Sequence, residues 1–373
     1  GICVDAWIML RSIRKFVSYR RRDLGFRLAS SALLGETRAR VSCRANQSAT
    51  RHAEDCFQNE IRREVLYLRR KMDSIKDFDE TSSRVLKKPG FYVASDGCKV
   101  YYEIHGNGPT RIIFIAGVLT PIAGFKFQQE FFDLHPDQYE VLYFDLRGVG
   151  NSDMGPTPLS TQLMAADVAG ILESIGWGSV HVVGISMGGM TSQNLALLCP
   201  TRIKTLTLIN TTAKGGVLAT PISFTSFANA VNLSRAKNIE QRIRALMRFQ
   251  YSQRLNDSER SEVIYQWLFE RFSSVKGNQG NNSAAFLQHF GSARRHNVPK
   301  EKLQLIRDMS FSKMVIIGTD DRMIKPSKGK ELASAIGAEL VVLEGFGHFV
   351  MAEDPPRIND LLVTFWDHHI SSQ

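Results

Sequence analysis

Short, strongly apolar runs alternate with helical stretches from about Gly90 onward, and this alternation constrains the fold more than any other feature. The runs are too uniformly apolar for a sheet with one face in water, so we expect strands covered by helices on both sides. Six such buried strands are predicted, at residues 111–117, 140–146, 180–186, 205–210, 314–318 and 339–345. This order predicts an α/β fold with a mostly parallel central sheet flanked by helices.

Two local patterns extend this prediction. An antiparallel pair of strands is expected to turn at Asp96 and Gly97 before the first buried strand. A helix is expected to begin after the candidate caps Ser160 and Thr161 and to end at Gly176. Its apolar stripe consists of Met164, Val168, Ile171, Leu172 and Ile175.

The predicted domain organisation has a core interrupted by an insertion. Residues 88–212 and 311–373 are expected to form the α/β core, and residues 213–310, which have helical texture and no convincing strand, a helical cap. An amphipathic helix is expected within residues 56–80, docked on the core or making a short coiled-coil contact. Residues 1–55 are expected to be a basic extension.

The composition of that N-terminal extension bears on location. From Met9 it is rich in Arg, contains Ser and has few acidic residues, with apolar residues near helical spacing, which is typical of a mitochondrial transit peptide. The alternatives are a disordered basic tail or a wrongly assigned start. We therefore expect a mitochondrial location if the segment is a leader and a cytoplasmic one otherwise.

The positive charge is unevenly distributed. The net charge is +10, and residues 1–51 and 213–310 each contribute +8, so the remaining segments are mildly acidic. This distribution does not fit a nucleic-acid-binding domain. Arg242, Arg244 and Arg248 in the insertion are consistent with weak contact to an anionic membrane, or with a solvated helix face.

Cysteine spacing and hydropathy exclude further classes. Five widely spaced cysteines show no metal-ligand spacing and are expected to be free thiols. The sequence contains no run of 18 apolar residues, so no membrane-spanning helix is predicted. The sequence gives no indication of the oligomeric state.

The strongest chemical signal follows the strand at 180–186. Gly184-Ile185-Ser186-Met187-Gly188-Gly189 joins that strand to a helical stretch, which is the context of a nucleophile elbow. Gly184 and Gly188 are expected because a side chain beside so tight a turn would clash. Ser186 is therefore the candidate nucleophile, and the N–H of Met187 the candidate oxyanion donor.

A serine hydroxyl needs a base and a group that orients the base, which in this type of site follow the serine in the order Asp, His. Asp320 and Asp321 follow the strand at 314–318, and His348 follows the strand at 339–345. We predict Asp321 as the acid because the first carboxylate in such a turn more often caps the loop. His368 and His369 are expected in a tail beyond the final helix.

Four motifs together carry a family resemblance, GISMGG, FDLRGVGNSD at 144–153, GTDDRMIKP at 318–326 and GFGHFVMAEDP at 345–355. Residues 90–370 resemble the capped serine hydrolases of the α/β-hydrolase fold, including bromoperoxidase-like esterases, aclacinomycin methylesterase and aminoacrylate hydrolases. The resemblance implies a second oxyanion N–H from the residue after a His-Gly pair. Because Ala116-Gly117 stands there, Val118 takes that role without the imidazole that often braces the loop. Asp145 and Arg147 are expected to support the site structurally.

The mechanism implied is acyl transfer through a serine acyl-enzyme, without a metal or organic cofactor. The expected substrate is a carboxylic ester, or a related acyl bond, of a small or lipid-like molecule. A cofactor-free perhydrolase or a C–C hydrolase would use the same triad, and a low-turnover ligand receptor would retain it. The motifs do not distinguish these alternatives.

Overall fold

A computed structural model describes residues 86–156, 158–215, 237–256, 258–274 and 283–370. The extension at 1–55 and the amphipathic helix expected within 56–80 lie outside these residues, as do Cys3, Cys43 and Cys56. The remaining cysteines, Cys98 and Cys199, are free thiols. Within the described ranges, no helix is long and apolar enough to cross a membrane.

The architecture is built on one eight-stranded sheet with the order β1-β2-β4-β3-β5-β6-β7-β8. The pairs β1·β2 and β2·β4 are antiparallel, and the other neighbouring pairs are parallel. The strands are β1 (Lys87–Val93), β2 (Lys99–Gly106), β3 (Thr110–Ile115), β4 (Tyr139–Phe144), β5 (Val180–Ile185), β6 (Ile203–Ile209), β7 (Ser312–Gly318) and β8 (Glu339–Leu343). The six predicted buried strands and the antiparallel pair at Asp96 and Gly97 are confirmed.

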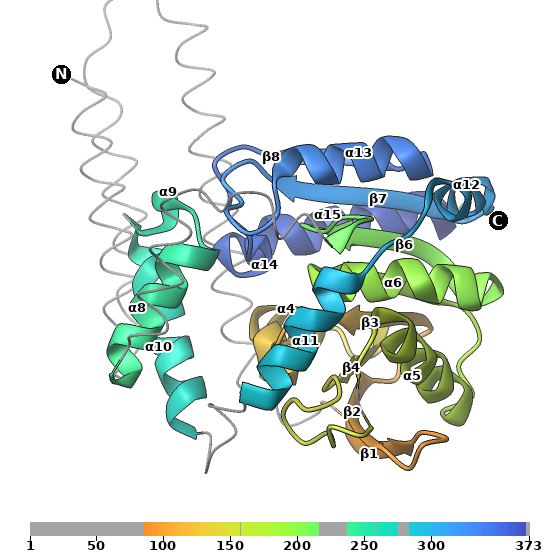
Figure 1. Ribbon diagram of the computed structural model, residues 1–373, viewed down its shortest axis with the longest axis horizontal. Helices are drawn as coiled ribbons and strands as arrows, with labels where there is room; N and C mark the ends of the chain where they lie inside the picture. Colours follow the sequence, from red (N-terminus) through yellow and green to blue (C-terminus); the bar gives the residue numbers. More distant parts are fainter. Residues whose placement is uncertain (1–85, 157, 216–236, 257, 275–282, 371–373) are drawn as a thin grey trace, which may run out of the picture. The chain divides into compact units, whose positions relative to one another are not determined.

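Helices cover both faces of the sheet. Figure 1 shows α5 and α6 in front of the strands and α15 behind them. The first face carries α5 (Thr161–Ser174), α6 (Met187–Leu198), α12 (Lys300–Asp308) and α13 (Pro326–Ile336). The second carries η1 (Ile122–Phe125), α4 (Lys126–Phe132), α14 (Val350–Glu353) and α15 (Pro355–Ile370). A short 3₁₀ helix, η2 (Pro200–Arg202), precedes β6.

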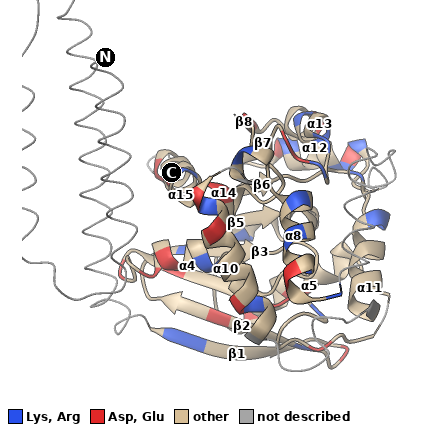
Figure 2. Cartoon of the chain, turned by 90° about the vertical axis from the view of Figure 1, so that its left-hand side faces the viewer, with Lys and Arg blue, Asp and Glu red and all other residues tan. Residues whose placement is uncertain are grey.

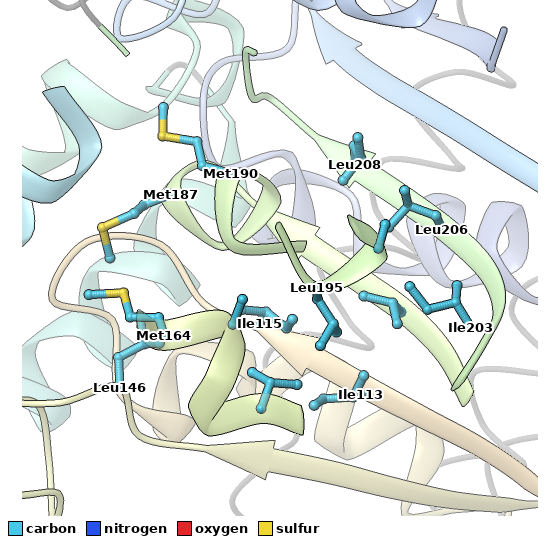
Figure 3. Packing of buried hydrophobic residues seen from close by; sticks show 14 of the residues in the cluster. Ile113, Ile115, Leu146, Met164, Met187, Met190, Leu195, Ile203, Leu206 and Leu208 are labelled. Carbon is cyan, nitrogen blue, oxygen red and sulfur yellow. The ribbon is translucent and has the colours of Figure 1, made fainter. Parts of the chain in front are cut away.

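The core lies in two layers because side chains alternate along each strand. On β3, Ile113 and Ile115 pack into the layer under α5 and α6, whereas Ile112 and Phe114 pack into the opposite layer. Figure 3 shows the first layer, where the two strand isoleucines lie below side chains of α6. Full burial of each such isoleucine contributes about 1.5–3 kcal/mol, which explains why the strands read as continuous apolar runs.

The helix predicted after residue 160 is α5. Its N-cap is Ser160, whose Oγ accepts a hydrogen bond from the N–H of Leu163 at 3.0 Å. Gly176 follows with φ +68°, a left-handed conformation suited to ending a helix. The predicted stripe faces the core, with Ile175 half-buried at its end. One prediction at the other end of the chain is wrong, since His368 and His369 lie within α15 rather than beyond it.

Four helices of the described residues lie between β6 and α12 and are called the inserted helices here. They are α8 (Ile239–Gln250), α9 (Gln253–Asn256), α10 (Glu259–Ser274) and α11 (Ser283–Arg295). Figure 1 shows α8 and α10 beside the end of the sheet toward which the arrow of β7 points. They pack against Phe127 of α4 and against Phe349, which follows His348. The insertion therefore meets the carboxyl ends of the strands, where open α/β sheets place their sites.

Charge on the inserted helices is mixed. Figure 2 shows basic and acidic residues on both α8 and α10. The guanidinium of Arg244 bonds Glu240 one turn away on α8, with an Nη2–Oε1 distance of 2.9 Å. Part of the predicted basic face is therefore compensated within its own helix.

Candidate active site

Ser186 occupies a strained turn between β5 and α6. Its backbone has φ 56° and ψ −120°, and it is one of three non-glycine residues of the described ranges with positive φ. Its N–H donates to the carbonyl of Ile209 at 2.9 Å, so the turn is fixed to the end of β6. Such strain persists only where the surrounding structure enforces it, and it is concentrated at functional sites. The backbone therefore marks Ser186 as a candidate functional residue.

Two glycines make the turn sterically feasible. A Cβ at Gly184 would lie 2.6 Å from the carbonyl oxygen of Gly188. A Cβ at Gly188 would lie 2.6 Å from the carbonyl oxygen of Ala116, on the loop after β3. The expected close approaches at Gly184 and Gly188 are therefore present.

Met187 is the first residue of α6, so its N–H has no acceptor within the helix. Its side chain extends into the core toward Met164 and Leu146 (Figure 3). Its backbone N–H belongs to the peptide shared with Ser186, at the positive end of the helix dipole. The arrangement is the one expected of an oxyanion donor.

The loop after β3 lies against Ser186 on the other side. A Cβ built on Gly117 would be 3.2 Å from the Cβ and 3.7 Å from the Oγ of Ser186. Val118 follows directly and is half-buried. The structure therefore brings the segment that carries the second predicted donor next to the candidate nucleophile.

Asp321 and His348 form a close pair. The Nδ1 of His348 lies 2.7 Å from the Oδ2 of Asp321, and both side chains are buried. The other carboxylate oxygen, Oδ1, accepts from the N–H groups of Met323 and Ile324 at 2.8 and 3.0 Å. A carboxylate held in this way fixes the orientation of the imidazole.

Asp320 is engaged elsewhere. Its Oδ2 accepts from the backbone N–H of Gln253 at 3.1 Å and from the Nη2 of Arg322 at 3.2 Å. Of the two carboxylates after β7, the structure places Asp321 against the histidine and Asp320 against the inserted helices.

Two adjacent residues at the end of β6 connect the turn at Ser186 to residues 344–349, the loop between β8 and α14 that carries His348 and is called the histidine loop here. The Oγ1 of Thr211 donates to the carbonyl of Ser186 at 2.7 Å. The Nδ2 of Asn210 donates to the carbonyl of His348 at 2.7 Å and to that of Gly347 at 3.1 Å. The two loops are therefore positioned from one common strand end.

The histidine loop is also bonded to the insertion. The N–H groups of His348 and Phe349 both donate to the carbonyl of Gln250 at the end of α8, at 2.8 and 3.1 Å. The Oε1 of Glu353 accepts from the N–H of Gly347 at 3.0 Å and from that of Ser252 at 2.8 Å. Burial raises the pKa of Glu353, although these hydrogen bonds act in the opposite direction.

Asp145 and Arg147, the residues expected to support the site, lie in the loop after β4 and bond neighbouring segments of the core. The carboxylate of Asp145 accepts from the N–H groups of Ile122 and Asn151 at 2.8 and 2.9 Å. Arg147 is buried and bonds Asp167 through Nε and Nη2, both at 2.7 Å. Its hydrogen bonds to Asp167 and then to Asp96 raise the pKa of the guanidinium, so it remains charged.

The model of the α/β hydrolase fold family matches residues 110–355 of this chain. The chain belongs to the α/β-hydrolase family. The fold and the resemblance predicted from the sequence motifs are therefore confirmed.

Named relatives of this α/β hydrolase include different kinds of hydrolase. A putative carbamate hydrolase RutD of Azorhizobium caulinodans is 26% identical over 277 residues, covering 74% of this chain and 97% of the relative. A 2-hydroxy-6-oxononadienedioate/2-hydroxy-6-oxononatrienedioate hydrolase of Dechloromonas aromatica is 24% identical over 278 residues, covering 72% and 91%. The solved structure of Est816, described as an N-acyl homoserine lactone degrading enzyme, aligns with a TM-score of 0.58 and 26% identity, covering 74% and 100%.

Several contacts in this α/β hydrolase were missed by the sequence reasoning. Asn210 had a usable signal, since it is a polar residue directly after a buried strand. Glu353 lies in the quoted motif after His348 but was given no role. His289, whose Nδ1 accepts from the N–H of Leu119 at 3.4 Å, had no signal because its partner is 170 residues away.

Within the described ranges, no group of three or more His, Cys, Asp and Glu could hold a metal ion. The polar groups at the strand ends are instead a serine hydroxyl, an oriented imidazole and backbone N–H groups. This set can perform proton transfer and nucleophilic attack on a carbonyl.

Proposed function

We propose that the protein is a serine hydrolase that cleaves a carboxylic ester, or a related acyl bond, of a small or lipid-like molecule. Ser186 is the nucleophile, His348 the general base and Asp321 the group that orients the base. The backbone N–H groups of Met187 and Val118 form the oxyanion hole. The inserted helices form a cap over the site.

The observation that carries the proposal is the combination of strained Ser186 with the Asp321–His348 pair. Positive φ at a serine between a strand and a helix is costly, and the 2.7 Å bond fixes the imidazole at the same edge of the sheet.

The proposed reaction has two steps. The Oγ of Ser186 bonds to the substrate carbonyl carbon while the Nε2 of His348 takes its proton, and that proton then goes to the departing alcohol. Water, deprotonated by His348, attacks the acyl-enzyme and releases the acid with Ser186 restored. Because Nδ1 donates to Asp321, Nε2 is the nitrogen left to act as the base.

A second candidate is hydrolysis of a carbon–carbon bond by the same groups. The relative from Dechloromonas aromatica, named a 2-hydroxy-6-oxononadienedioate hydrolase, favours it. The lactone-degrading activity named for Est816 favours an ester-like bond instead. Parallel assays with esters of graded acyl length and with vinylogous 1,5-diketones distinguish the two.

Labelling with a fluorophosphonate probe tests the nucleophile. We expect wild-type protein and Ser192→Ala to be labelled, because Ser192 is buried in α6 and its Oγ bonds the carbonyl of Gly188 at 2.8 Å. Ser186→Ala should not be labelled, and His348→Gln should react much more slowly. Undiminished labelling of Ser186→Ala would refute the assignment.

A low-turnover ligand receptor would retain the same arrangement. An ester that gives a burst of one product equivalent per Ser186 supports the enzyme. Ligand-induced stabilisation with no acylation would favour the receptor.

Location and membrane contact are further proposals that rest on sequence. Residues 9–51 fused to a fluorescent protein should enter mitochondria, and a diffuse cytosolic signal would contradict this. Weak binding to phosphatidylserine vesicles through the basic residues of α8 should weaken with salt. Binding insensitive to salt and to lipid charge would exclude that contact.

A further inference from the structure

Leu119, the residue after the proposed oxyanion donor Val118, has an unusual backbone conformation. Its φ is 52°, which a bulky residue adopts only when held there. The N–H of Thr120 donates to the carbonyl of Gly117 at 3.3 Å, so these four residues form a turn with Leu119 in third place. The peptide between Val118 and Leu119 is the central peptide of that turn.

Two inserted helices contact Leu119 through its backbone. The Nδ1 of His289, on α11, accepts from the N–H of Leu119 at 3.4 Å. The Nη2 of Arg271, on α10, donates to the carbonyl of Leu119 at 3.3 Å. The insertion therefore contacts both polar groups of the strained residue.

The partners of His289 determine its protonation state. Its Nε2 lies 2.7 Å from the carbonyl of Arg147, which can only accept, so Nε2 carries the proton. The N–H of Leu119 can only donate, so the Nδ1 of His289 is unprotonated and accepts this hydrogen bond. Burial lowers the pKa of His289, which favours this neutral form.

α11 provides a fixed platform for this imidazole. The Oε1 of Gln288 accepts from the N–H of Leu159 at 3.1 Å, and the Nη2 of Arg295 donates to the carbonyl of Leu159 at 2.9 Å. His289 itself is fully buried. The helix is thus anchored to the core on both sides of His289.

We propose that His289 is a positioning residue that holds the Gly117–Thr120 turn in the conformation in which the Val118 N–H can serve the oxyanion hole. This inference rests on the proposed function. Without the acceptor at Nδ1, the central peptide can rotate, which relieves the positive φ of Leu119 and reverses the Val118 carbonyl. The Val118 N–H belongs to the adjoining Gly117–Val118 peptide, which the turn then no longer holds, so the donor beside Ser186 loses its fixed place.

Two substitutions separate the two hydrogen bonds of His289. In His289→Asn the side-chain oxygen can occupy the position of Nδ1 and accept from Leu119. In His289→Gln the amide reaches the position of Nε2 and can bond Arg147, but nothing replaces Nδ1. Gln288→Ala is the matched control, because it removes one contact of the same helix while the bond from Arg295 to Leu159 still anchors that helix.

Kinetics and inhibitor binding give the first readout. We expect His289→Gln to lower kcat roughly 10- to 100-fold, somewhat less than the loss of an oxyanion donor, with KM changed less than about two-fold. Its affinity for a boronic acid that forms a tetrahedral serine adduct should fall by a similar factor. His289→Asn and Gln288→Ala should stay within about three-fold of wild type. Wild-type kcat in His289→Gln, or an equal loss in His289→Asn, would overturn the proposal.

Amide hydrogen exchange over residues 116–122 gives a second readout that does not require turnover. Exchange should accelerate in His289→Gln and remain near wild type in His289→Asn and Gln288→Ala. Equal exchange in all four proteins would overturn the positioning role. If wild-type protein is not labelled by the fluorophosphonate, the hydrolase proposal fails, while the exchange contrast still decides what holds the turn.

Discussion

The side-chain amide of Asn210 donates to the main-chain carbonyl oxygen of His348 at 2.7 Å, and its Oδ1 accepts from the N–H of Gly318 at 2.8 Å. Asn210 has φ 44°, a left-handed conformation that asparagine tolerates better than most residues. One side chain at the end of β6 therefore connects the ends of β7 and β8, which are followed by the proposed acid, Asp321, and the proposed base, His348.

Replacement of Asn210 by Gly should destabilise the protein by about 2–4 kcal/mol, because buried backbone groups lose their partners. Gly adopts positive φ without strain, so the loss comes mainly from the missing side-chain amide, with a smaller part from the greater freedom of Gly in the unfolded chain. We expect kcat to fall at least ten-fold because His348 is no longer held. Urea unfolding and ester kinetics measure the two effects; unchanged kcat would show that the other contacts of His348 suffice.

Asp321→Asn should lower kcat by about 10³- to 10⁴-fold, since an amide cannot hold the imidazole in the required tautomer. Asp320→Asn is the control, and we expect a change of less than about three-fold. Stopped assays on both folded variants measure this difference. A larger effect at Asp320 would reverse the assignment of the acid.

Arg147→Met should cost about 3–5 kcal/mol of unfolding free energy, because it leaves the buried carboxylate of Asp167 without its partner. Arg244→Ala, which breaks an exposed pair on α8, should cost under about 1 kcal/mol. Denaturant unfolding compares the two variants. A loss near zero for Arg147→Met would contradict the supporting role of this loop.

Acid should destabilise the protein through His296. Burial lowers its pKa from the usual 6.5 to about 4, so the unfolded chain binds a proton first as the pH falls. The stabilisation is complete above about pH 6.5 and is lost toward pH 4. One pKa unit corresponds to about 1.4 kcal/mol. Between pH 7 and pH 5 the free energy of unfolding of the wild type should therefore fall by about 2 kcal/mol more than that of His296→Asn.

Thermal or urea unfolding at both pH values measures this difference. Asn can keep the contact with the Oγ1 of Thr161, which lies 3.0 Å from the Nδ1 of His296, but it does not titrate. Parallel acid dependence in the two proteins would show that His296 is not the responsible group.

The sequence was sufficient for the sheet because full burial makes each parallel strand a continuous apolar run. It was also sufficient for the elbow, since the tight turn at Ser186 requires Gly184 and Gly188. It did not predict the hydrogen bonds of His289 or Glu353, because such contacts depend on how distant segments pack rather than on local spacing. The role of Val118 stays a prediction, although the structure brings its loop against Ser186.

The bonds from Gln250 to the backbone of His348 and Phe349 have a consequence for how substrate gains access. If α8 moved outward as a rigid body, these hydrogen bonds would displace His348, the proposed base. Entry of substrate by that route would misplace the imidazole until α8 returned to its position. A path that leaves the end of α8 at rest would keep the imidazole ready throughout the catalytic cycle.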